Sequence, residues 1–324
     1  MGDKDLEAIL RASTGAPPGV VIAVVGPTAT GKSDLAIALA LRLGGEVVGA
    51  DASQLYRGMD IGTAKVPGAE REGVPHHQVD VLDVTQEASV AAYQREARAD
   101  IEAVLARGRV PVVAGGSGLY VRAALDRLEI PPTDPQVRAA LQQRLDDEGV
   151  APLLAELRRL DPPAAEAIEP NNGRRVVRAL EVIALTGRPF SATMPAREFV
   201  RPTVLVGLRS DREALDRRID RRAQRMFDAG LVEETRALVD LGLREGRTAS
   251  RAVGYAQALA VIDGTMSSAD AVADTALRTR RLVRRQESWF GADPRVTWLD
   301  PLGKPVDALV DRLVEHVTHN GAHG

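Results

Sequence analysis

Gly26-Pro27-Thr28-Ala29-Thr30-Gly31-Lys32-Ser33 fits the pattern G-x-x-x-x-G-K-[S/T], which is typical of a loop that holds phosphate groups. The unbroken apolar run Val20–Val25 precedes it and predicts a strand buried on both faces, and a helical pattern over Lys32–Leu43 follows it. In that context the glycines let backbone N–H groups surround an anion, and the helix N-terminus adds its positive dipole end. Lys32 would add a full charge, and the Ser33 hydroxyl would ligate a Mg²⁺ ion that bridges phosphate oxygens. We therefore predict a binding site for a chain of phosphates.

The chain around this loop alternates strand and helix patterns. Further strands are predicted at Glu46–Ala50, Val110–Ala114 and Val200–Leu208, and an amphipathic helix at Ser89–Ala106. This alternation with short connections predicts an α/β fold, with a P-loop NTPase-like parallel sheet core flanked by helices. Between Pro131 and Ala196 there is no strand-like run, which predicts an all-helical insertion domain.

The later part of the chain returns to the core. Helices are expected at about 211–229, 231–243, 250–262 and 268–290, with a short strand at Val296–Leu299, whereas Gln54–Asp83 is expected to be irregular. The expected organisation is a mobile leader at 1–19, a first part of the core at 20–127, the helical insertion at 128–198, a second part of the core at 199–318 and a tail at 319–324.

Composition excludes several classes of protein. The 324 residues include no cysteine, which excludes disulfides, thiolate zinc sites, iron–sulfur clusters and a cysteine nucleophile. No apolar run approaches the roughly 18–20 residues that a membrane span needs, and Met1–Leu10 lacks the apolar centre of a signal peptide, so we expect a cytoplasmic protein. Only four of the 42 basic residues are lysine, and the formal net charge of −3 argues mildly against a nucleic-acid partner unless the arginines are clustered.

The motifs of two common phosphate-loop classes are missing. GTPases read guanine with N-K-x-D, but none of the three asparagines, Asn171, Asn172 and Asn320, is followed by lysine. A motor ATPase needs an apolar strand that ends in aspartate, whereas the strand at Val110–Ala114 runs into two glycines. Both classes are therefore disfavoured.

Asp51 follows the second predicted strand, at the sheet edge where α/β proteins bind ligands. A carboxylate there can hold Mg²⁺ through water or act as a general base, although a simple loop carboxylate or helix cap remains an alternative. Gln54 could bind the edge of a base, and Tyr56 could stack on one or pack in the core. Adjacent residues of an extended segment point to opposite faces, so for His76 and His77 we expect one packed and one exposed side chain rather than a metal pair.

Several motifs together resemble the bacterial tRNA dimethylallyltransferase family. They are the phosphate loop, the run from Asp51 through Gln54-Leu-Tyr56-Arg-Gly-Met-Asp-Ile-Gly-Thr63, and Gly115-Gly-Ser-Gly-Leu-Tyr120. Further matches are Arg174-Arg-Val-Val-Arg178-Ala-Leu-Glu181, Ser250-Arg-Ala-Val-Gly-Tyr255, and Arg284-Arg-Gln286 with Trp289. The resemblance extends from about Val20 to Phe290, which is most of the chain.

The resemblance implies a reaction. In this family the phosphate loop, here Gly26–Ser33, holds the diphosphate of dimethylallyl diphosphate, and the dimethylallyl group passes to N6 of adenosine 37 in tRNAs that read codons beginning with U. Thr28 would contact the diphosphate near the reaction centre, and Asp51 would take the proton that the adenine amine must lose. Because that base is stacked in the anticodon loop, it must be turned out to reach the pocket. Mg²⁺ is the expected cofactor, with Ser33 as its protein ligand.

The resemblance also implies contacts with the anticodon stem-loop. Matching residues are Asp51, Ala52, Ser53, Gln54, Ser117, Arg138, Arg174, Arg175, Val176, Val177 and Arg178. Two positions depart from the family pattern. Ala52 stands where the family has serine, which removes a hydroxyl, and Ser117 stands where it has threonine, which keeps one.

Arginines form two further groups. The helix at 211–229 has five of them, of which Arg218 or Arg222 would contact the diphosphate in this family, and the spacing does not choose between the two. A solvated helix face paired with Asp211, Asp216 and Asp220 is the alternative for this group. The second group lies near a single acidic residue, Glu287, and is expected to bind the tRNA backbone; its members are Arg278, Arg280, Arg281, Arg284 and Arg285.

Three hypotheses follow. The first is a tRNA-modifying prenyltransferase, a monomer by analogy with the family. The second is a P-loop small-molecule kinase that uses ATP, because such kinases share the loop, the carboxylate after the second strand and a helical insertion. The third is a non-catalytic RNA-binding protein gated by a nucleotide, for which loss of Asp51 would leave all activity intact.

Overall fold

The computed structural model describes residues 19–193, 197–301, 304–311 and 313, so nearly all of the expected leader and the whole expected tail lie outside the described residues. The chain forms two compact units. The first unit runs to Leu125 and resumes at Phe199, and the second is Asp126–Glu198, against an expected insertion at 128–198.

The first unit is built on a parallel sheet that has six strands within the described residues, in the order β3-β2-β4-β1-β5-β6. The strands are β1 (Val21–Val25), β2 (Glu46–Gly49), β3 (His76–His77), β4 (Pro111–Gly115), β5 (Thr203–Leu208) and β6 (Thr297–Leu299). Every residue of β1 is buried, as its apolar sequence requires for a central strand covered on both faces. The predicted α/β fold with a parallel sheet is confirmed.

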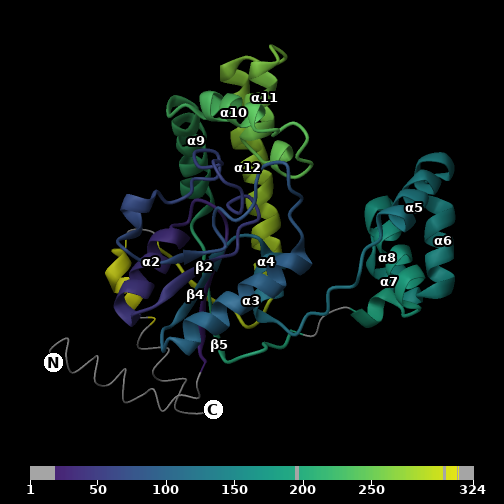
Figure 1. The fold of residues 1–324 in the computed structure, drawn as a ribbon, viewed down its shortest axis with the longest axis horizontal. Coiled ribbons are helices and arrows are strands. Elements are labelled where there is room, and N and C mark those ends of the chain that lie inside the picture. Colours follow the sequence, from purple (N-terminus) through teal and green to yellow (C-terminus); the bar gives the residue numbers. More distant parts are fainter. Residues whose placement is uncertain (1–18, 194–196, 302–303, 312, 314–324) are drawn as a thin grey trace. The chain divides into compact units, whose positions relative to one another are not determined.

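Helices pack on the sheet and extend beyond it (Figure 1). They are α2 (Lys32–Leu43), α3 (Val90–Ala106), α4 (Gly118–Leu125), α9 (Arg212–Asp228), α10 (Leu231–Asp240), α11 (Tyr255–Ile262) and α12 (Ser268–Gly291), with 3₁₀ turns η2 (Gly68–Arg71) and η4 (Ala249–Arg251). Leu35 and Leu39 of α2 pack in one apolar cluster with Ile22 and Val24 of β1. No helix in the described ranges has both the length and the apolar character that crossing a bilayer requires.

The connectivity brings three loops to one edge of the sheet. The phosphate loop follows β1, Asp51 follows β2, and Ser117 follows β4, which lies between β1 and β2. Since all strands are parallel, their carboxyl ends lie at the same edge of the sheet. The chain places β2, β3 and β4 on one side of β1 and then β5 and β6 on the other, and α/β proteins bind ligands at such a switch point. Helices α9 and α12 pack against each other and complete the surroundings of these loops.

The second unit consists of helices, with no strand among its described residues. They are α5 (Pro135–Glu148), α6 (Val150–Leu160), α7 (Pro162–Ala167) and α8 (Gly173–Thr186), followed by η3 (Phe190–Thr193). Asp134 and Asp161 cap α5 and α7 with their carboxylates, each ahead of a proline in the first turn. An apolar cluster from α6, α7 and α8 forms the core of this unit.

Local details differ from the sequence predictions. The short edge strand β3 was not predicted, and α11 begins at Tyr255 rather than near residue 250, because Gly254 has a φ of +96°. The expectation of one packed and one exposed histidine is wrong, since His76 and His77 are both half-buried. His77 Nε2 lies 2.6 Å from a carboxylate oxygen of Glu46, and His76 Nδ1 lies 2.9 Å from the Val74 carbonyl, so each ring finds a partner beside the sheet edge.

Candidate active site

A glycine conformation and two hydrogen bonds from side chains to the backbone hold the phosphate loop in shape. Gly26 has a φ of +131°, and a Cβ there would lie 2.5 Å from the carbonyl oxygen of Leu208, so only glycine fits. The Thr30 hydroxyl donates to the Pro27 carbonyl at 2.8 Å, and Lys32 Nζ donates to the same oxygen at 2.6 Å. The loop is therefore pre-shaped, with α2 beginning directly behind it.

A cavity of about 490 Å³ opens in front of this loop. Its walls are the phosphate loop, Asp51 and Gln54, the segment from Thr63 to Pro67, and three arginines of α9. The walls are mainly polar and include several positive charges, which suits a phosphorylated ligand.

A smaller pocket of about 100 Å³ adjoins the cavity and has a different character. The two share Thr28, Asp51, Thr63 and Arg222 among their lining residues. The rest of the smaller pocket combines an apolar group of side chains with a polar one. The apolar side chains come from α9, α12 and the turn before α11 and are Ile219, Ala223, Met226, Val253 and Leu282, whereas the polar ones are Ser53, Thr275, Thr279 and Gln286. The site can therefore accept a molecule with a charged part and a short apolar part, joined near Asp51.

Asp51 lies where the two spaces meet. Its Oδ1 accepts a hydrogen bond from the backbone N–H of Ser53 at 3.0 Å, which fixes the carboxylate at the start of the loop. The N–H of Ala52 donates to the Ser117 hydroxyl at 3.2 Å, so the loops after β2 and β4 are joined beside the carboxylate. Gln54 Nε2 donates to the Thr63 carbonyl at 3.2 Å.

The charges around Asp51 perturb one another. Burial lowers the pKa of Lys32 to about 8, the negative charge of Asp51 opposes this fall, and the positive charge of Arg222 adds to it. Burial also lowers the pKa of Arg222, again opposed by Asp51. One carboxylate thus faces two desolvated cations, an arrangement that favours binding of a further anion.

Arg218 and Arg222, between which the sequence did not choose, differ in the spaces that they line. Arg218 and Arg222 are both half-buried, but Arg218 lines only the larger cavity, whereas Arg222 lines both spaces. Arg222 Nη2 also donates to the Thr63 carbonyl at 3.3 Å, which orients the guanidinium toward the loop that Gln54 contacts.

Gln286 of α12 lies in the site, although no role in the site was predicted for it. Its Oε1 accepts from the backbone N–H of Thr28 at 3.0 Å, and its Nε2 donates to the Gly116 carbonyl at 3.0 Å. A Cβ on Gly116 would lie 2.3 Å from this amide nitrogen, so the close approach requires glycine. One buried amide therefore ties the phosphate loop to the loop that bears Ser117. The only signal in the sequence was a polar residue within the Arg284–Gln286 motif.

The remaining predicted residues of this unit have clear positions. Tyr56 is fully buried and its hydroxyl donates to the Gln86 carbonyl at 3.2 Å, so it packs in the core and is not available for stacking. Among the described residues no cluster of three or more histidine, cysteine, aspartate or glutamate side chains could hold a metal ion.

The predicted residues of the helical unit divide into two kinds. Arg174 and Arg175 are exposed at the start of α8. Val176 and Val177, at 0% and 4% exposure, pack in the core of the unit, so any contact with tRNA at these two positions would have to come from the backbone. The helical period explains their burial, because successive positions of α8 lie about 100° apart around the axis, so the exposed pair Arg174 and Arg175 is followed by a pair on the core face.

Arg138 and Arg178 are held by a buried carboxylate. Both donate to Glu181 Oε2 at 2.7 Å, and Arg178 also donates to the carbonyls of Pro131 and Pro132. Burial alone would raise the pKa of Glu181, but the hydrogen bonds from the two arginines hold it below its ordinary value. Arg138 keeps about half of its side chain exposed, whereas Arg178 is mostly occupied with these bonds.

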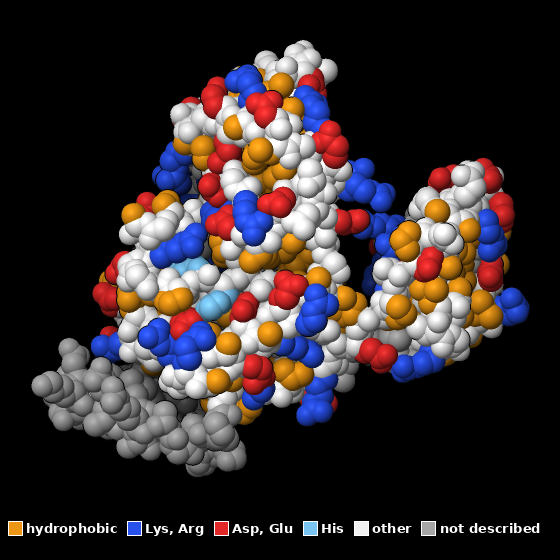
Figure 2. Space-filling model, in the orientation of Figure 1, with side chains coloured by type: hydrophobic (Ala, Val, Ile, Leu, Met, Phe, Trp, Pro, Cys, Tyr) orange, Lys and Arg blue, Asp and Glu red, His pale blue; other side chains and the backbone are white. Residues whose placement is uncertain are grey.

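The arginine group on α12 has more acidic neighbours than the sequence suggested. Arg278 pairs with Asp274 one turn earlier at 2.6 Å, Arg280 pairs with Asp220 of α9, and Glu287 is taken by Arg212. The expectation of a cluster near Glu287 alone is therefore wrong, because packing of α9 on α12 brings a second set of carboxylates. Figure 2 likewise shows Lys or Arg and Asp or Glu side chains interspersed on the visible face of the first unit.

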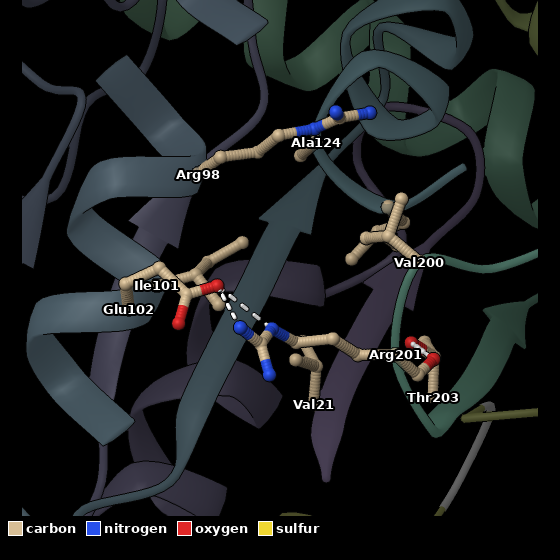
Figure 3. A pocket seen from close by; sticks show the side chains of 9 residues that line it. Val21, Arg98, Ile101, Glu102, Ala124, Val200, Arg201 and Thr203 are labelled. Carbon is tan, nitrogen blue, oxygen red and sulfur yellow. Dashed lines mark hydrogen bonds and ion pairs between the residues drawn. The ribbon is translucent and has the colours of Figure 1, made fainter. Parts of the chain in front are cut away.

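A third cavity, of about 200 Å³, lies away from these loops. Its lining includes Val21 and Thr203, at the starts of β1 and β5, and therefore at the sheet edge opposite the phosphate loop. Figure 3 shows Arg201 reaching across it to Glu102, with Arg98 on the far side. None of the predicted site residues lines this cavity, and its charges are already paired.

Comparison with known proteins agrees with the geometry. The family model described as "IPP transferase" matches residues 54–293. A protein of Nocardia farcinica named tRNA dimethylallyltransferase is 60% identical over 282 residues, which cover 87% of this chain and 90% of the relative. One of the same name from Streptomyces avermitilis is 59% identical over 285 residues, covering 88% and 91%.

Solved structures of related transferases are similar to this chain in fold. The full-length tRNA isopentenylpyrophosphate transferase of Bacillus halodurans matches with a TM-score of 0.69 and 37% identity, over 94% of this chain and 98% of that one. A eukaryotic dimethylallyltransferase, whose structures are described as snapshots of the enzyme acting on tRNA, matches with a TM-score of 0.79 and 25% identity, over 93% and 80% of the two chains.

Proposed function

The chain belongs to the IPP transferase family of tRNA dimethylallyltransferases, and from this premise we propose that it transfers the dimethylallyl group of dimethylallyl diphosphate to N6 of adenosine 37 in tRNAs that read codons beginning with U. The products are N6-(dimethylallyl)adenosine and diphosphate. The observation that carries the proposal is the polar cavity at the phosphate loop, which adjoins a partly apolar pocket, with Asp51 in the lining of both.

The donor fits the two spaces by its chemistry. Its diphosphate would lie at the phosphate loop, against backbone N–H groups, Lys32 and Arg222, and its five-carbon chain would lie in the smaller pocket, against the apolar side chains of α9 and α12. Diphosphate leaves only if its growing charge is stabilised, and fixed donors in a desolvated site provide that stabilisation.

The transfer exchanges one bond for another. The bond between C1 of the donor and the diphosphate oxygen breaks, its electron pair leaves with diphosphate, and N6 of the adenine forms a bond to C1. The nitrogen must lose a proton, which Asp51 would accept as general base. Thr28, in the lining of both spaces, would contact the diphosphate beside the reacting carbon.

The acceptor requires an extruded base. Adenosine inside a stacked anticodon loop cannot reach the carboxylate, so the nucleotide must turn out of the stack. Gln54 would hold the base by its edge, and Ala52, Ser53 and Ser117, which are joined to one another or to Asp51 by hydrogen bonds, would lie beside it. Arg138, Arg174 and Arg175 of the helical unit have exposed guanidinium groups that suit the tRNA backbone.

Mg²⁺ suits the donor set of the larger cavity. Ser33 and Asp34 line it beside Lys32, and Mg²⁺ is usually bound by one or two protein oxygens together with phosphate oxygens and water rather than by a full protein cage. Ser33 would therefore hold the ion against the diphosphate. The ion supplies additional positive charge to the leaving group when bound.

The kinase alternative is not supported. Relatives that are 59–60% identical over most of the chain are named tRNA dimethylallyltransferase, and the matching family model is described as IPP transferase, so nothing in these similarities points to a kinase. We propose further that the enzyme acts as a monomer in the cytoplasm, as the family resemblance implies.

Transfer of label from radioactive dimethylallyl diphosphate to a cognate, unmodified tRNA tests the proposal. We expect label in tRNA, dependent on an adenosine at position 37, and no phosphorylation when ATP replaces the prenyl donor. Absence of transfer with a tRNA shown to bind the protein would overturn the proposal. Binding of tRNA without transfer, equal in the wild type and in a variant without the Asp51 carboxylate, would instead favour a non-catalytic binding protein.

The two arginines of α9 provide a matched pair of variants. Arg222→Ala is expected to lower kcat/KM for dimethylallyl diphosphate by about 10- to 100-fold, because it removes a charged donor shared by both spaces. Arg218→Ala, at the edge of the larger cavity, is expected to lower it less than about 10-fold. Steady-state kinetics at saturating tRNA measures both, and a larger loss in the Arg218 variant would contradict the assignment.

A further inference from the structure

Trp289 is an exception to the way this chain treats its aromatic side chains. The four tyrosines are each at most 7% exposed and Phe290 is 3% exposed, whereas Trp289 on α12 is 45% exposed. A single exposed apolar side chain is ordinary on a protein surface. The position of Trp289, however, indicates a function for its exposed ring.

The indole lies on the loop after β4, which also contacts the residue next to Asp51. Its five-membered ring packs directly over Gly118, where a Cβ would lie 2.1 Å from ring atoms Cδ1 and Nε1. Gly118 follows Ser117, whose hydroxyl accepts from the N–H next to Asp51. Gln286, three residues earlier on the same helix, contacts Thr28 and Gly116. The exposed ring and the buried amide therefore contact neighbouring residues of the same loop from one face of α12.

The surroundings of the ring are apolar and cationic. Leu119, the residue after Gly118, is also 45% exposed. Arg285 lies one helical turn before Trp289 and is exposed, with no hydrogen bond or ion pair to any residue in the described part of the chain. An exposed aromatic ring with a neighbouring free guanidinium is the arrangement that single-stranded RNA favours, because bases stack on the ring and the cation meets the backbone.

We propose that Trp289 stacks on a base of the anticodon loop that adjoins the extruded adenosine, and that Arg285 binds a phosphate of the same strand. Turning adenosine 37 out of the loop leaves the neighbouring base with one unstacked face. A ring fixed beside the entrance replaces the lost stacking and keeps the loop open. The inference rests on the proposed function, since it needs a tRNA whose adenosine enters at Asp51.

Fluorescence provides a direct measurement because the chain has only two tryptophans. In the Trp298→Phe background, which leaves Trp289 as the sole indole, we expect an unmodified anticodon stem-loop RNA to quench the emission on binding. Binding of the variants is measured by the fluorescence anisotropy of a dye-labelled stem-loop, in which Trp289→Ala is expected to weaken RNA binding by about 5- to 150-fold, the range for loss of one stacked base. Trp289→Phe is expected to retain most of the affinity. Leu241→Ala, which removes another exposed apolar side chain, serves as the control.

A second measurement avoids dependence on the Trp298 background. With wild-type protein and a stem-loop that carries 2-aminopurine next to position 37, binding should change the fluorescence of the 2-aminopurine, and Trp289→Ala should remove most of the change. If wild-type enzyme transfers the dimethylallyl group but Trp289→Ala binds and reacts as well as wild type, the inference is wrong while the proposed function stands. Self-association that is lost in Trp289→Ala without any effect on RNA binding would also overturn it, by assigning the ring to a protein contact.

Discussion

Asp51→Asn is expected to lower kcat for dimethylallyl transfer by about 10²- to 10⁴-fold, the usual contribution of a positioned general base. Asparagine keeps the side-chain oxygen that accepts from the Ser53 N–H, so the loop should retain its shape. The amide cannot take the proton from the adenine amine. Single-turnover transfer with enzyme in excess over tRNA measures the loss at the chemical step, and the Kd for tRNA should change little.

Asp83→Asn is the matched control for this loss. Asp83 is an exposed carboxylate that pairs with Arg57 outside both cavities, and its loss should leave kcat unchanged. If Asp51→Asn retained more than about a tenth of the wild-type kcat, the general base would have to be another group. If it lost tRNA binding and kcat in parallel, the carboxylate would serve recognition rather than proton transfer.

The fold could be predicted because its signals are local. The apolar run of β1, the glycine-rich loop and the helical pattern of α2 lie within 24 consecutive residues, and each element is continuous in sequence. The strand β3 escaped prediction because its two residues, His76 and His77, have no apolar pattern. They join the sheet through backbone pairing with β2, which their side chains do not reveal.

The site could be predicted only in part, because much of it depends on contacts between distant segments. The phosphate loop and Asp51 carry recognisable motifs, but the hydrogen bond between Thr28 and Gln286 joins residues 258 positions apart. Nothing in either segment encodes that contact. Likewise, the apolar part of the smaller pocket arises from α9 and α12 packing together, and the same packing neutralises Arg280 with Asp220. The different positions of Arg218 and Arg222 relative to the two spaces also depend on this packing.

Lys32→Met is expected to lower kcat/KM for dimethylallyl diphosphate by about 10²- to 10³-fold, the cost of removing one fixed donor from a developing oxyanion. Methionine has a similar length without the charge and loses the hydrogen bond to the Pro27 carbonyl, but the Thr30 hydroxyl still donates to that oxygen and holds the loop. Steady-state kinetics at saturating tRNA, together with the affinity for inorganic diphosphate, measures the loss. Lys304→Met, at an exposed position, is the control and should have no effect.

The pH dependence of diphosphate affinity provides an independent test of the same charge. Burial sets the pKa of Lys32 at about 8, and the charged form is the one that attracts diphosphate. Diphosphate also titrates in this range, so the wild-type affinity is compared with that of Lys32→Met at each pH. The ratio of the wild-type affinity to that of the variant should be nearly constant below pH 8 and should fall by up to tenfold per pH unit above it, because only the wild type has the titrating lysine. A ratio that stays constant up to pH 9.5 would show that burial does not lower the pKa of this lysine.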